Sequence, residues 1–332
     1  MRAMEVVGAG FDQLKLVDRP IPEPGPGEVQ VRIKSATLNY RDVLLVQKGN
    51  PGGKMPYVPL SCACGEVTAV GSGVTRAQVG DRVMPTFFQN WFSGDIPSQE
   101  SVRALGGPLD GVAREFACFP QDAVVKAPDQ LGDLEVATLP CAGLTAWSAL
   151  FAARATKPGD TVVLMGTGGV SIAGLQLAKA AGATVIITSS SDAKLARARA
   201  MGADHTINYR SKPDWGVEAH SLAGGRGADV VLEVGGADTV SQSSRSLRQG
   251  GDVAAIGLLT GTPAWQAKNP PARLLRIRVG NRDQLEDLVR AIVATGIRPV
   301  VDRVFRLEDL SEALASLAGG RFFGKIGIEI GR

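Results

Sequence analysis

The sequence predicts an α/β protein in which a doubly wound parallel sheet is inserted into a β-rich domain. Residues 1–125 contain short alternating apolar runs separated by Pro/Gly turns, a pattern typical of strands. Residues 161–188 then read as strand, glycine turn, helix and strand, and further strands alternate with helical stretches to about residue 279. A final helix, strand, helix and strand, predicted from residue 283 to 330, can complete the first domain.

A chain of 332 residues exceeds one ordinary core, so two domains are expected. We predict a substrate domain of residues 1–127 and 279–332, and a nucleotide-binding domain of residues 128–278, with the substrate between them. The strands predicted in the first domain are residues 29–33, 65–70, 81–84, 113–119 and 123–126, followed by a helix at 134–139. Those of the second domain are 161–165, 184–188, 205–208, 229–234, 253–256 and 274–279, with a helix at 239–247.

Composition excludes several classes of partner. A net charge of +3, from 36 basic and 33 acidic residues, gives no field strong enough to indicate nucleic acid or a membrane. No segment approaches the roughly 18 apolar residues of a membrane span, and the first residues form no apolar leader. The four cysteines do not resemble a disulfide scaffold. We therefore expect a cytoplasmic protein with reduced thiols that acts on a small molecule.

The glycine turn after residue 165 predicts a phosphate-binding site. Glycines can take positive φ and let the backbone approach a ligand, and the following helix, residues 170–181, offers free N–H groups to a pyrophosphate. The second strand follows at the spacing of a Rossmann unit. Ser171 stands where a third glycine is expected, so the alternative is a glycine-rich corner of another α/β domain. The predicted phosphate-binding residues are Gly166, Thr167, Gly168, Gly169 and Val170.

Hydroxyl residues follow the second strand, where NAD-binding proteins usually carry a carboxylate for the ribose. Ser189, Ser190 and Ser191, with Lys194 close behind, offer small donors and one cation to a 2′-phosphate. We therefore predict NADP(H) rather than NAD(H), although Lys194 could instead be a solvated helix residue. Asp192 is predicted to be the N-cap of the next helix, residues 192–201.

A series of short motifs then points to a family. They are NYRD at residues 39–42 with a glycine at 49, GEVTAVG at 65–71, VGDRV at 79–83, AGLTAW at 142–147, the glycine turn, GAD at 202–204 before INY at 207–209, IG at 256–257 and GKI at 324–326. In this order they resemble the medium-chain dehydrogenase/reductase superfamily, in its zinc-independent, quinone-oxidoreductase-like branch, over essentially the whole chain. The resemblance implies a GroES-like substrate domain, a Rossmann domain, NADPH as hydride donor and a homodimer formed through the Rossmann sheets.

The resemblance also implies roles for single residues. Lys194 and Tyr209 would flank the 2′-phosphate, although Tyr209 could be a plain strand-end residue. Thr145 would lie beside the nicotinamide, unless it is a helix-interior threonine that bonds to the preceding turn. Lys325 would approach the cofactor or be a surface strand residue. The other residues expected to line the nicotinamide pocket are Asn39, Ile256, Gly257, Leu258 and Asn281.

No metal site is predicted. In the zinc-using branch of the superfamily, the catalytic ligand positions correspond to Asn39, about Ser61, and Cys141, and one surviving ligand cannot hold Zn²⁺. The lobe that holds a second zinc in that branch corresponds to residues 85–114, which contain no cysteine, and the two histidines, 205 and 220, lie in the nucleotide domain. Cys62 and Cys64 are expected to be two buried small hydrophobic residues. Many relatives carry an acidic residue at the position of Cys62.

Without a metal, hydrogen-bond donors must stabilise the developing oxyanion, which favours quinones, enones and enals as hydride acceptors. Asn39 could hold the nicotinamide ribose or the substrate oxygen, and Tyr40 or Tyr57 could donate a proton. Arg41 could polarise the oxygen, but an ion pair with a carboxylate is favoured. The predicted catalytic residues are Asn39, Tyr40 and Thr145, and none is identified as the proton donor.

The segment 87–111 is aromatic at one end and glycine-rich at the other, so it is either a loop that selects apolar substrates or a packing element. Two alternatives to the reductase stay open. One is a zinc-independent alcohol or aldehyde dehydrogenase of the same superfamily. The other is a non-catalytic NADPH-binding sensor.

Overall fold

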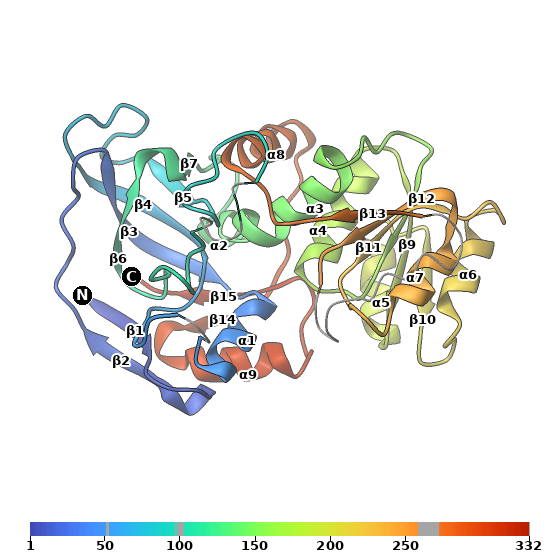
Figure 1. The fold of residues 1–332 in the computed structure, drawn as a ribbon, viewed down its shortest axis with the longest axis horizontal. Coiled ribbons are helices and arrows are strands. Elements are labelled where there is room, and N and C mark those ends of the chain that lie inside the picture. The colour runs from blue at the N-terminus through green and yellow to red at the C-terminus, as the bar shows by residue number, and fades with distance from the viewer. Residues whose placement is uncertain (51–52, 97, 99–102, 258–271, 332) are drawn as a thin grey trace. The chain divides into compact units, whose positions relative to one another are not determined.

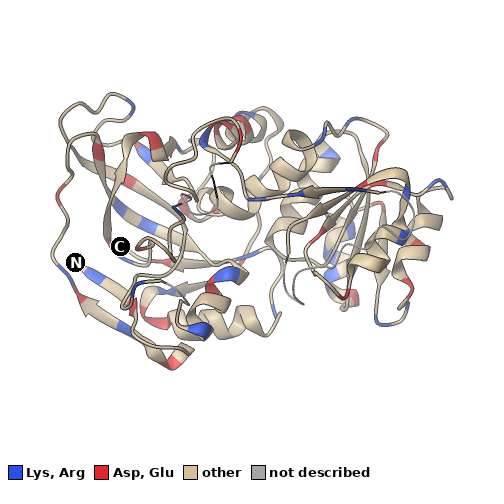
Figure 2. Cartoon of the chain, viewed as in Figure 1, with Lys and Arg blue, Asp and Glu red and all other residues tan. Residues whose placement is uncertain are grey.

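A computed structural model of the protein describes residues 1–50, 53–96, 98, 103–257 and 272–331. The chain forms two compact units, of which the first contains Met1–Leu144 and Gly280–Arg332 and the second contains Thr145–Val279. Residues 128–144 therefore group with the first unit, whereas the sequence prediction gave them to the nucleotide-binding domain. Basic and acidic residues are interspersed over each unit (Figure 2).

The first unit is built on a seven-stranded sheet with strand order β14-β15-β3-β4-β5-β7 and with β6 paired to β3 (Figure 1). Because β15 pairs antiparallel with β3, the last strands of the chain complete the sheet of the N-terminal segment. A separate two-stranded sheet joins β1 and β2. The strands are β1 (Arg2–Val6), β2 (Leu14–Asp18), β3 (Glu28–Thr37), β4 (Cys62–Val70), β5 (Arg82–Pro85), β6 (Phe116–Pro120), β7 (Val124–Lys126), β14 (Val301–Arg306) and β15 (Lys325–Glu329). The helices are α1 (Tyr40–Lys48), α2 (Asp133–Val136), α8 (Arg282–Thr295) and α9 (Leu310–Ala318).

Strand β3 shows why this sheet forms. Val29, Val31 and Ile33 alternate with polar residues, so one face of the strand is buried in the core while the other is partly exposed. At its C-terminal end the strand is buried on both faces, and there Thr37 pairs with Cys62 at the start of β4. This register places the beginning of β4 next to the loop that leads into α1.

The second unit contains a six-stranded sheet with order β10-β9-β8-β11-β12-β13, in which every neighbouring pair is parallel. This is the strand order of a Rossmann fold, so the predicted fold class is confirmed. The strands are β8 (Thr161–Leu164), β9 (Thr184–Ser189), β10 (His205–Asn208), β11 (Ala228–Glu233), β12 (Leu247–Ala255) and β13 (Arg273–Arg276). The helices are α3 (Leu144–Trp147), α4 (Gly169–Ala180), α5 (Asp192–Ala200), α6 (Trp215–Leu222) and α7 (Val240–Ser246).

Two strand predictions in this unit differ from the structure. Strand β12 begins at Leu247, six residues before the predicted start at 253, and β13 ends at Arg276 instead of 279. Residues 248–250 are Arg, Gln and Gly, which gave no apolar signal in the sequence. Their backbone nevertheless extends the strand, because Leu247 pairs with Ala228 of β11.

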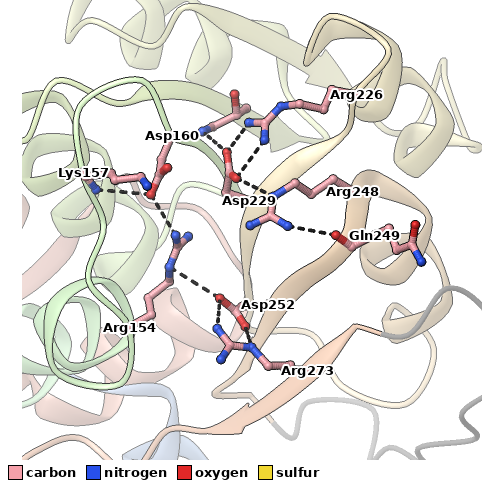
Figure 3. A network of polar contacts seen from close by, with 10 residues as sticks. Arg154, Lys157, Asp160, Arg226, Asp229, Arg248, Gln249, Asp252 and Arg273 are labelled. Carbon is pink, nitrogen blue, oxygen red and sulfur yellow. Dashed lines mark hydrogen bonds and ion pairs between the residues drawn. The ribbon is translucent and has the colours of Figure 1, made fainter.

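Aspartates at the amino-terminal edge of this sheet form a network with arginines (Figure 3). Arg154 is only 9% exposed and pairs with two buried carboxylates, at 2.8 Å from Asp160 and 3.5 Å from Asp252. Arg273 lies 2.8 Å from the other side of Asp252. The third carboxylate of the network, Asp229, accepts from Arg226 and Arg248, each at 2.6 Å. Together with the Thr161 N–H, which donates to Asp229 at 2.8 Å, these pairs tie the connection before β8 to strands β11, β12 and β13.

One helical run among the described residues, Asp133–Ala152, is long and apolar enough to cross a membrane by length and composition. In its most apolar window, 72% of the residues are buried inside the fold, as in the core helix of a soluble protein. Two stretches of this run, Leu139–Gly143 and Ser148–Ala152, are π-helical. Single π-turns of this kind are often found near functional sites.

Candidate active site

The glycine turn of the second unit joins β8 to α4. Gly166 has φ 69°, which favours glycine, and a Cβ added there would meet no atom within 4 Å. The backbone is therefore open to a ligand on this side. Gly168 is the extended N-cap of α4, and the helix begins at Gly169 with no side chain capping its N–H groups. Free N–H groups beside open space are what a pyrophosphate needs.

Ser171 explains why the third glycine of the fingerprint is dispensable here. Its hydroxyl donates to the Met165 carbonyl at 2.6 Å, so the side chain ties the first turn of α4 to the end of β8. Gly174, one turn further on, faces Leu164 and Leu232 in the tight helix–strand contact. Close packing of helix on strand is thus provided by another glycine.

The end of β9 carries serine hydroxyls, as the sequence predicts, and the end of β10 lies beside it. Ser189 pairs with Asn208, and the Tyr209 N–H donates to the Ser189 carbonyl at 3.1 Å. The Tyr209 side chain is 41% exposed, and Ser190 is half-buried. Lys194 follows in the first turn of α5. The structure therefore brings this predicted set into one region of the second unit.

One detail of this region corrects the sequence prediction. The N-cap of α5 is Ser191, whose Oγ accepts from the Lys194 N–H, and not Asp192. Ser191 has extended φ/ψ, as an N-cap requires, whereas Asp192 is already helical. The Asp192 carboxylate instead accepts from Asn208 Nδ2 at 2.8 Å, which links α5 to β10.

Glu233, at the end of β11, is a buried carboxylate that sequence reasoning missed. Its Oε1 accepts from the backbone N–H groups of Gly235 and Gly236, at 2.7 and 3.0 Å, and from Thr239 Oγ1 at 2.7 Å. Its Oε2 accepts from Ser243 Oγ. Glu233 therefore organises the loop after β11. The signal that could have revealed it is a charged residue at the end of an otherwise apolar strand, directly before two glycines.

Ile256 and Gly257, predicted to line the nicotinamide pocket, follow β12. Both N–H groups donate to the Glu233 carbonyl, at 2.9 and 3.0 Å. A Cβ on Gly257 would lie 1.7 Å from the Val234 carbonyl oxygen, so only glycine fits this close approach. Leu258 lies outside the described residues. Thr145 is buried in α3, and its contact with a nicotinamide stays a prediction.

In the first unit, Lys325 is the centre of a buried polar cluster. Its side chain is 5% exposed, and its ammonium donates to the Leu38 carbonyl and to Asn39 Oδ1, the latter at 2.7 Å. The alternative of a surface strand residue is therefore excluded. The amide nitrogen of Asn39 forms hydrogen bonds as well: Nδ2 donates to Ser61 Oγ at 3.3 Å and to Cys62 Sγ at 3.1 Å.

The surroundings of Cys62 correct the expectation of two apolar cysteines. Cys62 and Cys64 are both buried, but the Cys62 sulfur contacts Asn39, Ser61 and Cys141. Burial by itself would raise the pKa of Cys62. The hydrogen bond from Cys141, the charge of Lys325 and the two other donors overcome this effect and lower the pKa to about 7. The hydrogen bond with Cys62, together with burial, raises the pKa of Cys141 well above its usual value.

The Asp42 carboxylate stabilises the first turn of α1 and bonds to the backbone of Asn39, a member of this cluster. Its Oδ2 accepts from the Asn39 N–H at 2.8 Å, and burial raises its pKa despite the nearby charge of Arg41. Arg41 lies 3.8 Å from Asp42, which is the ion pair favoured by the sequence analysis, and it also donates to the Leu105 carbonyl at 2.8 Å. Its guanidinium stacks over the Phe87 ring.

The two tyrosines considered as proton donors lie in different surroundings. Tyr40 is 42% exposed at the first position of α1. Tyr57 belongs to the hydrophobic core, where burial and the neighbouring Asp42 raise its pKa to about 12. A phenol this reluctant to ionise is a poor source of a proton near neutral pH. Tyr40 therefore stays the candidate of the two.

Asn281 is the N-cap of α8. Its Oδ1 accepts from the Gln284 N–H at 2.9 Å, and its own N–H donates to the Gln284 side chain at 3.2 Å. These contacts give Asn281 a structural role, and a contact with the cofactor stays a prediction. In the described part of segment 87–111, Phe87, Phe88 and Trp91 are buried and contact one another, which is a packing role.

The described residues include no group of three or more His, Cys, Asp or Glu side chains arranged to hold a metal ion. At the positions that correspond to zinc ligands in the zinc-using branch, Asn39 and Ser61 share a hydrogen bond, and Cys141 faces Cys62. His205 and His220 belong to the second unit.

Comparison with known proteins identifies the family. The model of the alcohol dehydrogenase GroES-like domain matches residues 25–129, and that of the zinc-binding dehydrogenases matches residues 169–294. A zinc-type alcohol dehydrogenase-like protein of Schizosaccharomyces pombe is 40% identical over 334 residues, which cover 97% of this chain and 96% of that protein.

Solved structures agree with this comparison. A protein of Sinorhizobium meliloti 1021, assigned as an alcohol dehydrogenase, aligns over 99% of both chains with 42% identity and a TM-score of 0.89. A quinone oxidoreductase of Pseudomonas syringae and a mycobacterial protein in complex with NADPH each align over 99% of both chains with 28% identity, at TM-scores of 0.83 and 0.82. The chain therefore belongs to the medium-chain dehydrogenase/reductase superfamily of nicotinamide-dependent oxidoreductases, and it is alcohol dehydrogenase-like in architecture.

Proposed function

We propose that the protein is an NADPH-dependent reductase that transfers hydride to a conjugated carbonyl or a quinone without zinc. The observation that carries the proposal is the polar cluster of the first unit. Asn39, which the resemblance aligns with a ligand position of the zinc-using branch, carries an amide instead of a thiolate, and the Lys325 ammonium donates to that amide at 2.7 Å. A reaction there depends on hydrogen bonds and a fixed positive charge for oxyanion stabilisation.

The cofactor preference rests on the end of β9. Serine hydroxyls stand where an NAD-binding protein usually carries a carboxylate, and Tyr209 is held against the same strand end by its N–H bond to Ser189. Lys194 supplies a cation one turn into α5. These groups suit a 2′-phosphate, and NADPH would supply the hydride when bound. The similar mycobacterial structure is itself a complex with NADPH.

The substrate class follows from the electrophile that such a site can activate. Conjugated carbonyls and quinones spread the negative charge of hydride addition, so they need less stabilisation than a simple ketone. In this proposal Asn39, Tyr40 and Thr145 contact the nicotinamide or the substrate, and Lys325 keeps the Asn39 amide oriented through its 2.7 Å bond. The protein acts in the cytoplasm as a homodimer.

A zinc-independent alcohol or aldehyde dehydrogenase is the second candidate, because a relative that is 40% identical and a solved structure that is 42% identical both carry alcohol dehydrogenase names. Initial rates with NADPH and NADH against a panel of quinones, enals, ketones and aldehydes distinguish the two. We expect turnover of quinones or enals with NADPH. Turnover restricted to simple alcohols and ketones would support the second candidate.

Metal analysis of the same preparation tests zinc independence. We expect well below one zinc per chain and no loss of rate after treatment with a chelator. One tightly bound zinc per chain, lost together with activity, would overturn that part of the proposal. Tight NADPH binding with no turnover of any compound would instead indicate a sensor.

A further inference from the structure

A pocket of about 350 Å³ lies at the amino-terminal edge of the sheet of the second unit, and all the residues that line it belong to this unit. Its volume is at the lower end of the range of small-molecule sites. The charged side chains that line it are Arg154, Lys157, Asp160, Arg226, Asp229 and Arg248. Four cations therefore face two carboxylates. Asp252 and Arg273, which continue the network outside the pocket, cancel each other, so an excess of two positive charges remains (Figure 3).

Three nitrogens of these cations have no acceptor among the residues that the structure describes. Arg154 donates to its two aspartates from Nη2 and Nε, whereas its Nη1 is buried and forms no hydrogen bond. Arg248 donates from Nε to Asp229 and from Nη1 to the Gln249 carbonyl, which leaves Nη2 without a bond. The Lys157 side chain is exposed, and its ammonium forms no ion pair within the described residues. Unpaired buried donors cost free energy, which an anionic ligand can recover.

The cations reach the pocket from several connections of the unit (Figure 3). Arg154 and Lys157 precede β8, Arg226 precedes β11, and Arg248 belongs to β12. Bonds to aspartates hold the three guanidinium groups in place, at 2.8 Å for Arg154 and 2.6 Å for the other two. Because these donors are already ordered, they lose little conformational freedom when an anion binds. The charge of the buried Arg154 is also screened less by salt than an exposed charge.

We propose that this pocket binds a small anion through a phosphate group, carried either by inorganic phosphate or by a small phosphate monoester. A phosphate monoester has a charge of about −1.5 to −2 at pH 7 and three strong acceptor oxygens. It therefore matches both the two excess positive charges and the three unpaired nitrogens. A carboxylate brings only one charge and two oxygens. Guanidinium and ammonium groups are also the side chains that bind phosphate in proteins.

The pocket is separate from the predicted cofactor site. Arg154 and Lys157 come before β8, whereas the glycine turn at Gly166 comes after it. The four residues of β8 separate the two edges of the sheet by about 13 Å. A ligand in the pocket therefore leaves the glycine turn free for a pyrophosphate. The inference does not depend on the proposed reductase activity.

Isothermal titration calorimetry of the full-length protein, in a buffer without phosphate, tests the proposal. The ligands are inorganic phosphate and glycerol 3-phosphate, each titrated with and without saturating NADPH. We expect saturable binding of about one ligand per chain in the millimolar range or tighter, because a few charge-assisted hydrogen bonds suffice for that affinity. The tighter of the two ligands identifies the source of the phosphate group. Succinate, whose two charges lie on separate carboxylates, should bind about tenfold more weakly or less tightly still.

Three results would overturn the proposal: no saturable binding of either phosphate ligand, equal or tighter binding of succinate, or complete loss of phosphate binding when NADPH is present. The last result would place the anion at the cofactor site. Failure of NADPH itself to bind would count against the proposed reductase and would leave the inference about this pocket intact.

Substitutions at the exposed side of the pocket locate the site. Lys157→Gln and Arg226→Met should each weaken phosphate binding about tenfold, because each removes one of the unbalanced charges. Both proteins should fold, since Lys157 is exposed, Arg226 is 55% exposed, and Asp229 keeps Arg248. The matched control is Lys15→Gln, which removes one charge from an exposed position of β2 in the first unit and should leave the affinity unchanged. Equal weakening in Lys15→Gln, or none in the two pocket variants, would show that phosphate binds elsewhere.

Discussion

Removal of Arg154 tests the ion network at the amino-terminal edge of the Rossmann sheet. Arg154 is 9% exposed and bridges Asp160 and Asp252, whose side chains are 6% and 2% exposed. Arg154→Met keeps most of the apolar stem but leaves both carboxylates with one partner fewer. Breaking a buried ion pair from one side typically costs about 3–5 kcal/mol. We expect Arg154→Met to lower the free energy of unfolding by about 3 kcal/mol, at the low end of this range, because each carboxylate keeps another donor.

The remaining donors are visible in the structure (Figure 3). Asp252 keeps Arg273 at 2.8 Å, and Asp160 keeps the Lys157 N–H at 3.2 Å. Urea unfolding followed by far-ultraviolet circular dichroism measures the loss in free energy of unfolding.

The matched control is Arg226→Met. Arg226 is 55% exposed, and its partner Asp229 keeps Arg248 at 2.6 Å, so its removal should cost less than about 1 kcal/mol. Equal losses for Arg154→Met and Arg226→Met, or no loss for Arg154→Met, would refute the reasoning that burial makes the Arg154 pairs matter.

Four further predictions follow from other residues. Gly257→Ala should destabilise the protein by roughly 2 kcal/mol or more, measured by urea unfolding, because its Cβ would collide with a backbone carbonyl 1.7 Å away. Glu233→Ala should cost at least about 2 kcal/mol in the same assay, because it strands two buried backbone N–H groups, whereas Glu233→Gln should cost less. The pKa of Asp229 is lowered, because its bonds to arginines and to the Thr161 N–H overcome the effect of burial. Its contribution to stability is therefore present above the unfolded pKa of about 4 and is lost as pH falls through the lower folded pKa. The decrease in urea midpoint from pH 5 to pH 3 should be smaller in Asp229→Asn than in the wild type. Lys194→Ala should weaken NADPH binding about tenfold and leave NADH binding unchanged, as measured by fluorescence titration. Equal effects on the two cofactors would contradict the assignment of a 2′-phosphate site.

The Rossmann unit was predictable because its signals are local. The turn at Gly166, the helix after it and the second strand follow one another within 30 residues, and each depends on its own short stretch of sequence. The N-cap of α5 was assigned to Asp192 instead of Ser191 because both residue types favour this position and they are adjacent. Only the backbone angles distinguish them.

The polar cluster of the first unit was not predictable, because its members come together only through the sheet. Asn39 follows β3, Cys62 begins β4 and Lys325 begins β15, and the register of three neighbouring strands decides that they meet. In the sequence, Cys62 reads as one more small apolar residue of a buried strand. Its donors are invisible until the pairing is known.

The bond between Lys325 and Asn39 spans 286 positions of the chain, and the whole second unit is synthesised between them. On the ribosome, the contiguous nucleotide-binding unit can fold as soon as its last strand emerges, because domains generally fold as units during synthesis. The first unit must wait with an incomplete sheet until β15 arrives and closes against β3. During this interval the backbone edge of β3 and the thiols at the start of β4 are uncovered. Pairing of β15 with β3 is therefore the step that covers them and protects the nascent enzyme from misassembly.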